Sequence, residues 1–254
     1  MEYLWLCLSA VAAGAINAVA GGGTLLTFPT LSSVLALSIS KNLAVQIANG
    51  TSTVALFPGS FASVWGYRRQ LPACKRWTAW LTLPSLVGGL IGAALVGDTF
   101  RSVIPYLILL AAVLFLLQPT IARLMKRQTA ALREPSGKLL AGIIAMQFFI
   151  GIYGGYFGAG IGILMLSSLS FLGLKDLHET NALKSFLAFC MNFVAAIVFV
   201  ARDMVVWKYA LAMAVTAIIG GYLGARFALL LPTYIVRWIV IIIGFSLAAY
   251  YFAT

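Results

Sequence analysis

Two glycine-rich clusters, each bordered by polar side chains, mark the places in this sequence where chemistry is expected. Residues 13–24 read AGAINAVAGGGT, and residues 151–160 read GIYGGYFGAG. Glycine costs a helix about 1 kcal/mol relative to alanine, and inside a membrane the freed backbone groups need new partners. Broken apolar segments at matching positions in two halves of a chain are typical of a transporter binding site. Close helix packing through small residues is the alternative, and the repetition favours a site.

The candidate site residues are glycines of these clusters together with polar side chains that lie within apolar segments. Intramembrane polar residues are functional candidates by default. Ser and Thr, however, often only bond a carbonyl of their own helix, and a lysine near a helix end can extend to the membrane surface. The set is Asn17, Gly21, Gly22, Gly23, Thr24, Asn49, Thr51 and Ser52 in the first half, and Tyr153, Tyr156, Gly158, Gly160, Lys184, Ser185 and Asn192 in the second.

These groups are mainly hydrogen-bond donors, and the chemistry they predict is anion binding. A helix that begins directly after each cluster, at Thr24 and at Ile161, would direct its N-terminal N–H groups and positive dipole end at the break. No Asp or Glu lies deep in an apolar segment, which argues against a cation carrier or a proton relay. The three cysteines and the single histidine show no metal-ligand spacing. The sequence therefore predicts no enzyme activity, no cofactor and no metal site.

The composition is that of a helical membrane protein. Of the 254 residues, 62% are hydrophobic and 9% are charged, whereas soluble domains carry about 25% charged residues. The apolar runs are too long for the strands of a membrane barrel. The net charge of +11 does not indicate nucleic acid, because the basic residues lie mostly between apolar runs, as the positive-inside rule expects.

About ten apolar segments predict an all-α fold that crosses the membrane several times. Two of them, 24–38 and 160–173, fall short of the roughly 20 residues that a full span needs, and each directly follows a glycine cluster. The segments are 3–20, 24–38, 43–65, 77–97, 102–118, 139–157, 160–173, 180–200, 207–230 and 233–252.

The two halves of the chain resemble each other, which predicts an internal duplication. The matching positions are Gly14 with Gly151, residues 48–52 with residues 182–186, Arg68 with Arg202, and GGLIGA at 88–93 with GGYLGA at 220–225. The predicted organisation is a first transmembrane repeat over 1–118, a basic cytoplasmic linker over 119–138 and a second transmembrane repeat over 139–254.

The basic loops set the expected orientation. Loops 66–76 and 119–138 carry four and five Lys or Arg residues and are separated by two spans, so both are expected on the cytoplasmic side. Both termini are then external, and the two repeats are inverted. The regions 3–38 and 139–173 fit either two full crossings or a re-entrant hairpin with its glycines at mid-depth. A single broken crossing would make the repeats parallel, but the weaker charge of loop 201–206 favours the inverted arrangement.

Several short motifs, spread over nearly the whole chain, carry a resemblance to a known family. They are Gly14 to Thr24, Phe28-Pro29-Thr30-Leu31, Ala48-Asn49-Gly50-Thr51-Ser52, Tyr67-Arg68-Arg69 and, in the second half, Gly151 to Gly160. In these motifs the sequence resembles the TauE/SafE family of sulfite and organosulfonate exporters, which implies a membrane transporter of sulfur-containing anions. One departure is Leu183-Lys184-Ser185, where Gly-Thr-Ser is common in the family. It places a cation beside the expected anion.

These features together predict a multi-pass transporter of the plasma membrane (the bacterial inner membrane) that exports a small anion. The resemblance implies sulfite or an organosulfonate, moved through a site between the two repeats. The expected partners are that anion and the lipid bilayer, without nucleic acid, and homo-oligomerisation is left open. Anion uptake or a channel-like permease is the alternative within transport, and a non-transporting membrane assembly subunit is the alternative of another class. The breaks in both halves favour transport, because a structural subunit would have little reason to break two helices at depth.

Overall fold

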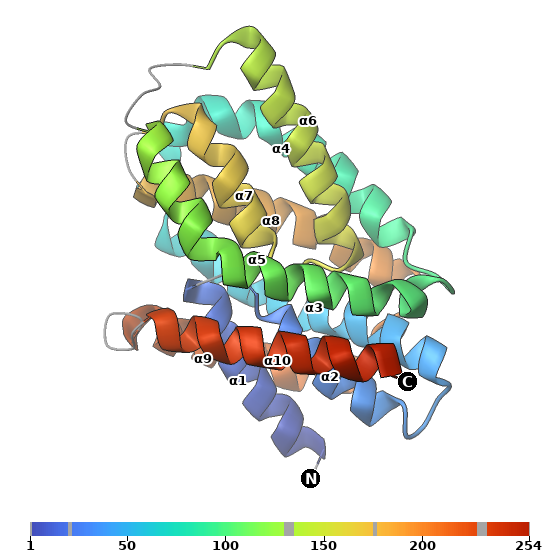
Figure 1. The fold of residues 1–254 in the computed structure, drawn as a ribbon. Helices are drawn as coiled ribbons and strands as arrows, with labels where there is room; N and C mark the ends of the chain where they lie inside the picture. The colour runs from blue at the N-terminus through green and yellow to red at the C-terminus, as the bar shows by residue number, and fades with distance from the viewer. Residues whose placement is uncertain (1, 20–21, 130–134, 175–176, 228–232, 254) are drawn as a thin grey trace.

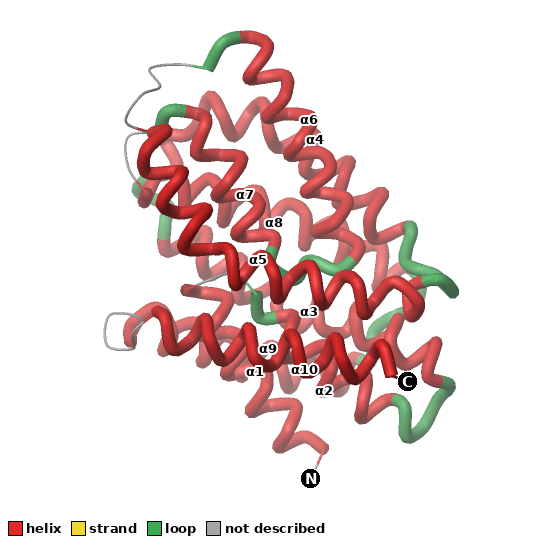
Figure 2. Tube along the Cα trace, in the orientation of Figure 1, coloured by secondary structure: helices red, strands yellow, loops and turns green. Residues whose placement is uncertain are grey.

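The computed structural model of the chain describes residues 2–19, 22–129, 135–174, 177–227 and 233–253, and these form helices and connecting turns without a strand. Ten α-helices and two 3-10 turns follow one another in this part of the chain (Figures 1 and 2). In order they are α1 (Glu2–Val19), α2 (Thr24–Leu35), α3 (Lys41–Gly66), η1 (Leu71–Cys74), α4 (Lys75–Ala94), α5 (Phe100–Thr129), α6 (Gly137–Tyr156), α7 (Ile161–Leu169), η2 (Ser170–Leu172), α8 (Leu177–Ala201), α9 (Trp207–Phe227) and α10 (Thr233–Ala253).

Four stretches of the described chain are long and apolar enough to cross a membrane. They are Leu71–Ala94, Phe100–Ile121, Gly137–Tyr156 and His178–Ala201, and shorter apolar helices accompany them. Together with the helix order this confirms the predicted all-α, multi-pass membrane fold. The central helix α3 has 26 residues, but it carries many polar side chains. Several of these side chains reappear in the candidate site.

The helices that follow the glycine clusters are short. The helix α2 has 12 residues and α7 has 9. At 1.5 Å per residue they are about 18 and 14 Å long, against a hydrocarbon core of about 30 Å. Each contacts the helix that precedes it, α1 and α6 respectively. The lengths of α2 and α7 do not fit two full crossings at 3–38 and 139–173, although α6 alone is long enough to cross.

The predicted linker 119–138 is partly helical. The helix α5 continues through Pro119 to Thr129, because a proline disturbs mainly the turn before it and the following residues are mostly good helix formers. Residues 130–134 of the linker lie outside the described part of the chain. After them Ser136 caps α6, since its side-chain oxygen accepts a hydrogen bond from the Leu139 N–H.

The two halves of the protein interlock instead of forming two separate domains. By sequence, α1 to α5 correspond to α6 to α10. The helix α4 packs on α6 and α8 of the second half, and its counterpart α9 packs on α1 and α3 of the first half (Figure 1). The pairs α3–α8 and α5–α10 join the halves directly. The contacts thus repeat with the halves exchanged, as expected for a duplicated chain, while the inverted orientation of the repeats stays a prediction.

Some of the cluster glycines serve this interlocking. A Cβ on Gly92 of α4 would overlap the Ile152 carbonyl of α6, and one on Gly14 of α1 would overlap the Ala217 carbonyl of α9. Gly151 of α6 faces the backbone of α4 in the same way. Helices in lipid associate through such close backbone approach. The packing alternative therefore holds for Gly14 and Gly151, which are the first glycines of the two aligned motifs.

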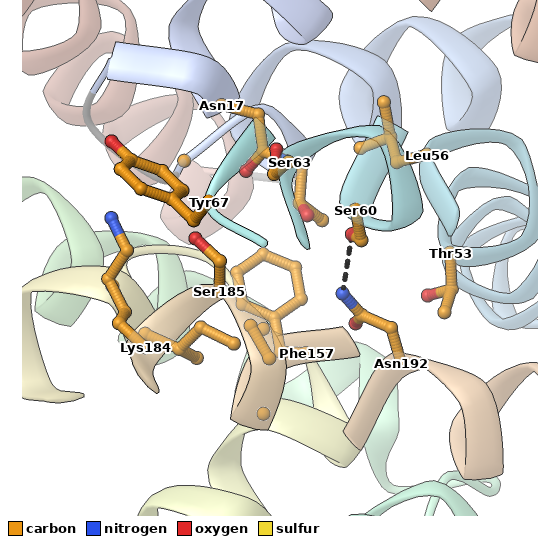
Figure 3. Close-up of a pocket in the computed structure, with 17 residues that line it drawn as sticks. Asn17, Thr53, Leu56, Ser60, Ser63, Tyr67, Phe157, Lys184, Ser185 and Asn192 are labelled. Carbon is orange, nitrogen blue, oxygen red and sulfur yellow. Dashed lines mark hydrogen bonds between the residues drawn. The ribbon is translucent and has the colours of Figure 1, made fainter. Parts of the chain in front are cut away.

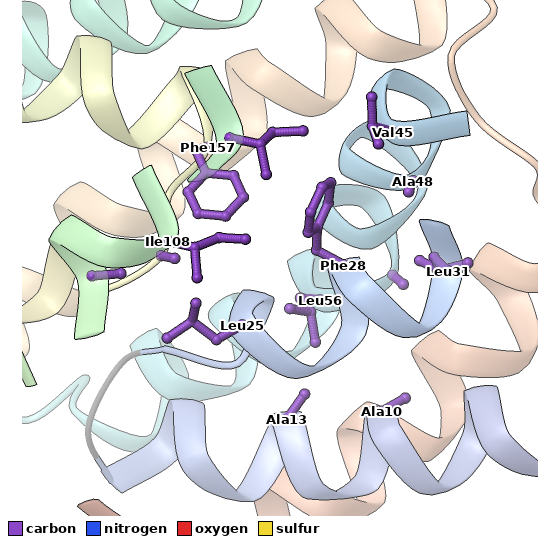
Figure 4. Close-up of a cluster of buried hydrophobic side chains, with 14 of the residues drawn as sticks. Ala10, Ala13, Leu25, Phe28, Leu31, Val45, Ala48, Leu56, Ile108 and Phe157 are labelled. Carbon is purple, nitrogen blue, oxygen red and sulfur yellow. The ribbon is translucent and has the colours of Figure 1, made fainter. Parts of the chain in front are cut away.

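A core of buried apolar side chains surrounds α2. The Phe28 ring is fully buried and meets the rings of Phe100 and Phe157 edge-on, with centroids 6.3 and 5.4 Å apart. Because Phe157 directly follows α6, this cluster connects the breaks of both halves (Figure 4).

Candidate functional site

Both glycine breaks border one small cavity. It lies between the starts of α2 and α7 and the helices α3 and α8, and its volume is about 70 Å³ (Figure 3). A cavity needs a volume of about 10–15 Å³ to hold one water molecule. The size of this cavity therefore suits a few waters or one small ion. It is lined by Asn17, Gly22, Thr24, Thr53, Leu56, Ser60, Ser63, Tyr67, Gly154, Phe157, Gly158, Ile161, Gly162, Lys184, Ser185, Ala188 and Asn192.

The starts of two helices reach this cavity. Gly22 and Thr24 line it at the start of α2, and Gly162 lines it at the start of α7. Before α7, Gly158 and Gly160 have φ angles of 78° and 76°, a left-handed conformation that glycine adopts readily. Helix N-termini present unpaired N–H groups and a partial positive charge. Two of them at one cavity favour a bound anion.

Hydroxyl and amide groups form most of the remaining polar wall. Asn192 Nδ2 of α8 donates to Ser60 Oγ of α3 at 3.2 Å, which joins the two halves across the cavity (Figure 3). The hydroxyls of Thr53 and Ser63 donate to carbonyls four residues earlier in α3. None of the described residues that line the cavity is Asp or Glu. The wall therefore offers donors and no negative charge of its own.

Lys184 brings a positive charge to the cavity. Its side chain is half-buried, and its amino group extends toward the side of the cavity where Tyr67 lies (Figure 3). Within the described part of the chain, this ammonium group has no hydrogen-bond or ion-pair partner. A cation inside a membrane protein without a counter-charge is costly. An anion in the cavity would supply that counter-charge.

The structure brings part of the predicted site together at this cavity. The predicted residues on its wall are Asn17, Gly22, Thr24, Gly158, Lys184, Ser185 and Asn192. The predicted residues that are described but do not line it are Gly23, Asn49, Thr51, Ser52, Tyr153, Tyr156 and Gly160. Gly21 lies outside the described residues.

Three predicted residues of α3 bond neighbouring elements and do not face the cavity. Asn49 is buried, and its Nδ2 donates to the Tyr156 carbonyl at the end of α6 (3.0 Å). Thr51 Oγ1 accepts a hydrogen bond from the Val206 N–H just before α9 (3.0 Å). Ser52 Oγ shares a hydrogen bond of 2.6 Å with a threonine of α2. These side chains hold α3 against the elements that shape the cavity.

A hydrogen bond from a tyrosine stabilises the turn at the second glycine cluster. The hydroxyl of Tyr153 donates to the Ala159 carbonyl at 2.6 Å and so holds the turn between α6 and α7. In the first break, Gly23 lies so close to α1 that a Cβ would meet the Ala13 carbonyl at 2.5 Å. These residues therefore position the two helix starts that border the cavity.

One face of α3, together with Tyr67 directly after it, supplies lining residues that the predicted set omits. They are Thr53, Leu56, Ser60, Ser63 and Tyr67, spaced three or four residues apart. Such spacing places side chains on one side of a helix. It is visible in the sequence, but it shows only that these residues share a face. The packing of α8 and the two breaks against that face makes it a cavity wall.

An all-helical membrane protein with a donor-lined cavity at two broken helices has the architecture of a membrane transporter. The sequence matches the family described as sulfite exporter TauE/SafE over residues 6–251. The chain therefore belongs to the TauE/SafE family, a family of membrane transporters.

Several bacterial proteins are similar to this chain along most of its length. It is 27% identical over 239 residues to a "probable membrane transporter protein" of Haemophilus influenzae, covering 92% of this chain and 88% of that protein. It is 27% identical over 251 residues to "probable membrane transporter protein ORF9" of a Sinorhizobium species, covering 96% and 90%. With "probable membrane transporter protein YfcA" of Escherichia coli it shares 26% identity over 245 residues, covering 94% and 86%. No solved structure matches the chain.

Proposed function

We propose that the protein exports a small sulfur-containing oxyanion, sulfite or an organosulfonate, through the cavity at the starts of α2 and α7. The observation that carries this proposal is the ammonium group of Lys184, which has no partner among the described residues and lies beside two helix N-termini and a wall without a described acidic residue. The description of the matched family as a sulfite exporter supports the substrate and the direction.

The cavity has the groups that such an anion needs when it leaves water. A sulfite or sulfonate group presents three oxygens that accept hydrogen bonds from several directions. Lys184 would supply the opposite charge, and the hydroxyls of Thr24 and Ser185 lie on the same wall. Charge-assisted hydrogen bonds are roughly twice as strong as neutral ones. These donors would replace the hydration shell of the anion.

Export of an anion needs no coupling ion. A membrane potential that is negative inside favours outward movement by about 2.3 kcal/mol per charge per 100 mV, and by about twice that for a divalent ion. The described wall of the cavity offers no carboxylate to carry a proton or to hold sodium. We therefore expect electrogenic export that the membrane potential drives.

Sulfite flux in proteoliposomes tests this proposal, with a potassium–valinomycin potential and without a pH or sodium gradient. The protein is expected to move sulfite in the direction that the sign of the potential sets. Lys184→Gln is expected to lower flux at low sulfite roughly ten-fold or more, because hydrogen bonds to charged groups contribute about 1.5–3 kcal/mol. Lys75→Gln, an exposed position at the start of α4, is the matched control and should keep full flux.

Three results would count against the proposal. Flux that ignores the sign of the potential and follows an imposed pH gradient would contradict the potential-driven mechanism. Full flux in Lys184→Gln would remove this lysine from the site. A folded preparation that moves neither sulfite nor any sulfonate of a test panel would contradict export of sulfur oxyanions.

A further inference from the structure

The two halves of the protein differ at one pair of corresponding contacts. Gly89 of α4 corresponds to Gly221 of α9 in the aligned sequences. A Cβ on Gly89 would lie 3.0 Å from the Val194 side chain and 3.1 Å from the Met191 backbone, so α8 presses directly on α4. A Cβ on Gly221 would meet only the Gly14 carbonyl, at 3.8 Å. At this position α8 therefore closes tightly on α4, whereas space remains beside α9 at the corresponding contact with α3.

The open contact is a groove that joins the anion cavity. Its volume is about 860 Å³, and Gly59 of α3 and Gly221 of α9 both face it. Asn17, Ser63 and Tyr67 line both the groove and the cavity. The cavity therefore opens toward the C-terminal end of α3.

Two arginines at corresponding positions of the aligned halves also differ in their contacts. Arg202, just after α8, donates from Nη1 to the carbonyls of Ala93 and Ala94 at 3.3 and 3.2 Å. These carbonyls lie at the C-terminus of α4, where the helix carries a partial negative charge. The counterpart Arg68, just after α3, donates to the Trp65 carbonyl of its own helix at 3.0 Å and lies over the Trp65 ring. One arginine thus holds α8 on α4, whereas the described contacts of the other stay on α3.

The helices α3 and α8 form a connected pair between α9 and α4. Asn192 of α8 donates to Ser60 of α3, and the rings of Phe57 and Phe189 stack with centroids 5.3 Å apart. Helix α3 contacts α9, and α8 contacts α4. Because of these links, movement of α8 away from α4 would carry α3 toward α9.

Hydrogen bonds also join α3 to the start of α9, and α8 to the start of α4. Thr51 in the first half of α3 accepts a hydrogen bond from the Val206 N–H, just before α9. Cys74 Sγ, just before α4, donates to the Glu179 carbonyl in the first turn of α8 (3.3 Å). These hydrogen bonds hold the α3–α9 and α4–α8 pairs together at one end. The two pairs can therefore differ at the opposite end, where the arginines lie.

We propose that Arg68 and Arg202 are alternating positioning residues of the transport cycle. In the present structure Arg202 keeps the α4–α8 side closed, and the cavity opens past Tyr67, the residue before Arg68. In the other state the α3–α8 pair moves onto α9, Arg68 docks on the last carbonyls of α9, and the α4–α8 side opens. This inference rests on the proposed transport function but not on which anion is moved.

Thiol labelling tests the closed side without any substrate. The reporter is Met191→Cys, because Met191 is fully buried and its backbone lies against Gly89. Arg202→Gln is expected to raise the labelling rate by a membrane-impermeant maleimide roughly ten-fold, because it removes two charge-assisted bonds, and Arg202→Lys should restore part of the protection. Arg68→Gln is the matched control and should leave the reporter protected. The background carries Cys7→Ala, Cys190→Ala and Cys74→Ser, the last of which keeps a donor.

Two results of this labelling would contradict the proposed role of Arg202. The first is unchanged protection of Met191→Cys in Arg202→Gln. The second is equal labelling in Arg202→Gln and Arg68→Gln, because a general loosening of the fold would affect both variants alike.

A substitution that fills the groove tests whether α3 closes on α9 in the other state. Gly221→Leu places a side chain in the open groove, so the present state is kept but α3 cannot close on α9. We expect flux to fall roughly ten-fold or more, and we expect Met191→Cys to stay protected even when Arg202→Gln is added. Gly142→Leu on α6, where a Cβ would have no neighbour within 4 Å, is the control and should keep full flux.

The readouts separate this inference from the proposed substrate. Wild-type flux in Gly221→Leu would show that closure of the groove is not part of the cycle. If sulfite does not move but the labelling changes as expected, the substrate proposal fails, whereas the proposed alternating role of Arg68 and Arg202 stands.

Discussion

At the scale of single residues, Lys184 makes the candidate site asymmetric. Its counterpart in the first half is Gly50, by the alignment of residues 48–52 with 182–186. Gly50 lies against the Met204 carbonyl, where a Cβ would not fit. The aligned positions therefore hold a packing glycine in one half and a cation in the other. The breaks and hydroxyls come from both halves, but the charge comes from the second half alone.

The glycines at the breaks should matter more for transport than for membrane insertion. A leucine at Gly22 would overlap the Phe115 ring, and one at Gly158 would have to adopt a φ of 78°, at a cost of about 1–2 kcal/mol. Leucine also adds apolar surface, which favours insertion. We expect Gly22→Leu and Gly158→Leu to lose sulfite flux while the amount of inserted protein stays near wild type. Flux per inserted protein is the measurement.

The matched control for these variants is Gly137→Leu, at a position where a Cβ has no neighbour within 4 Å. If Gly22→Leu and Gly158→Leu both transport like this control, the break glycines are packing devices and not part of the site.

At the scale of elements, α3 shows how one helix divides its polar residues between two roles. Asn49, Thr51 and Ser52 bond α6, the chain before α9, and α2, whereas Ser60 and Ser63 line the cavity. A helix turns once every 3.6 residues, so neighbouring positions in the sequence meet different surroundings. The cavity-lining face and the anchoring face therefore lie on the same element, and each depends on the position of the other.

The α4–α6 contact should be highly sensitive to added side-chain volume. A leucine at Gly92 would overlap the Ile152 carbonyl, and overpacking costs typically about 1–3 kcal/mol. We expect Gly92→Leu to lower the thermal unfolding temperature of the detergent-solubilised protein clearly below that of wild type. Gly220→Leu, which would overlap the Val11 carbonyl at the corresponding α9–α1 contact, should behave alike. Unfolding temperatures equal to that of Gly142→Leu would show that these contacts tolerate side chains.

At the scale of the whole molecule, the halves depend on each other for their core. The fourth helix of each half packs on the first and third helices of the other half. Neither half can therefore bury its glycine-lined faces alone. The cavity lies where the two halves meet, so its wall requires residues of both halves (Figure 3).

The orientation in the membrane is a property of the whole chain and is tested by labelling. Single cysteines near position 70, near position 130 and at the C-terminus are placed in a background without native cysteines. Because the positive-inside rule puts loops 66–76 and 119–138 in the cytoplasm, the first two should react only from that side. The C-terminus should react from outside. A C-terminus that reacts from the same side as position 130 would contradict the inverted arrangement.

The sequence by itself determined the membrane class and the two breaks, and it predicted the duplication. These follow from local properties of the chain, namely the lengths of apolar runs, the glycine clusters and their recurrence. The tertiary structure alone decided which donors face the cavity. Asn49 and Tyr153 have the right chemistry, but the packing of α6 and α7 sets their directions and leaves them behind the wall. It also decided that the α4–α8 contact is tight while a groove remains between α3 and α9, because two similar local sequences can differ in this way only through the helices packed against them.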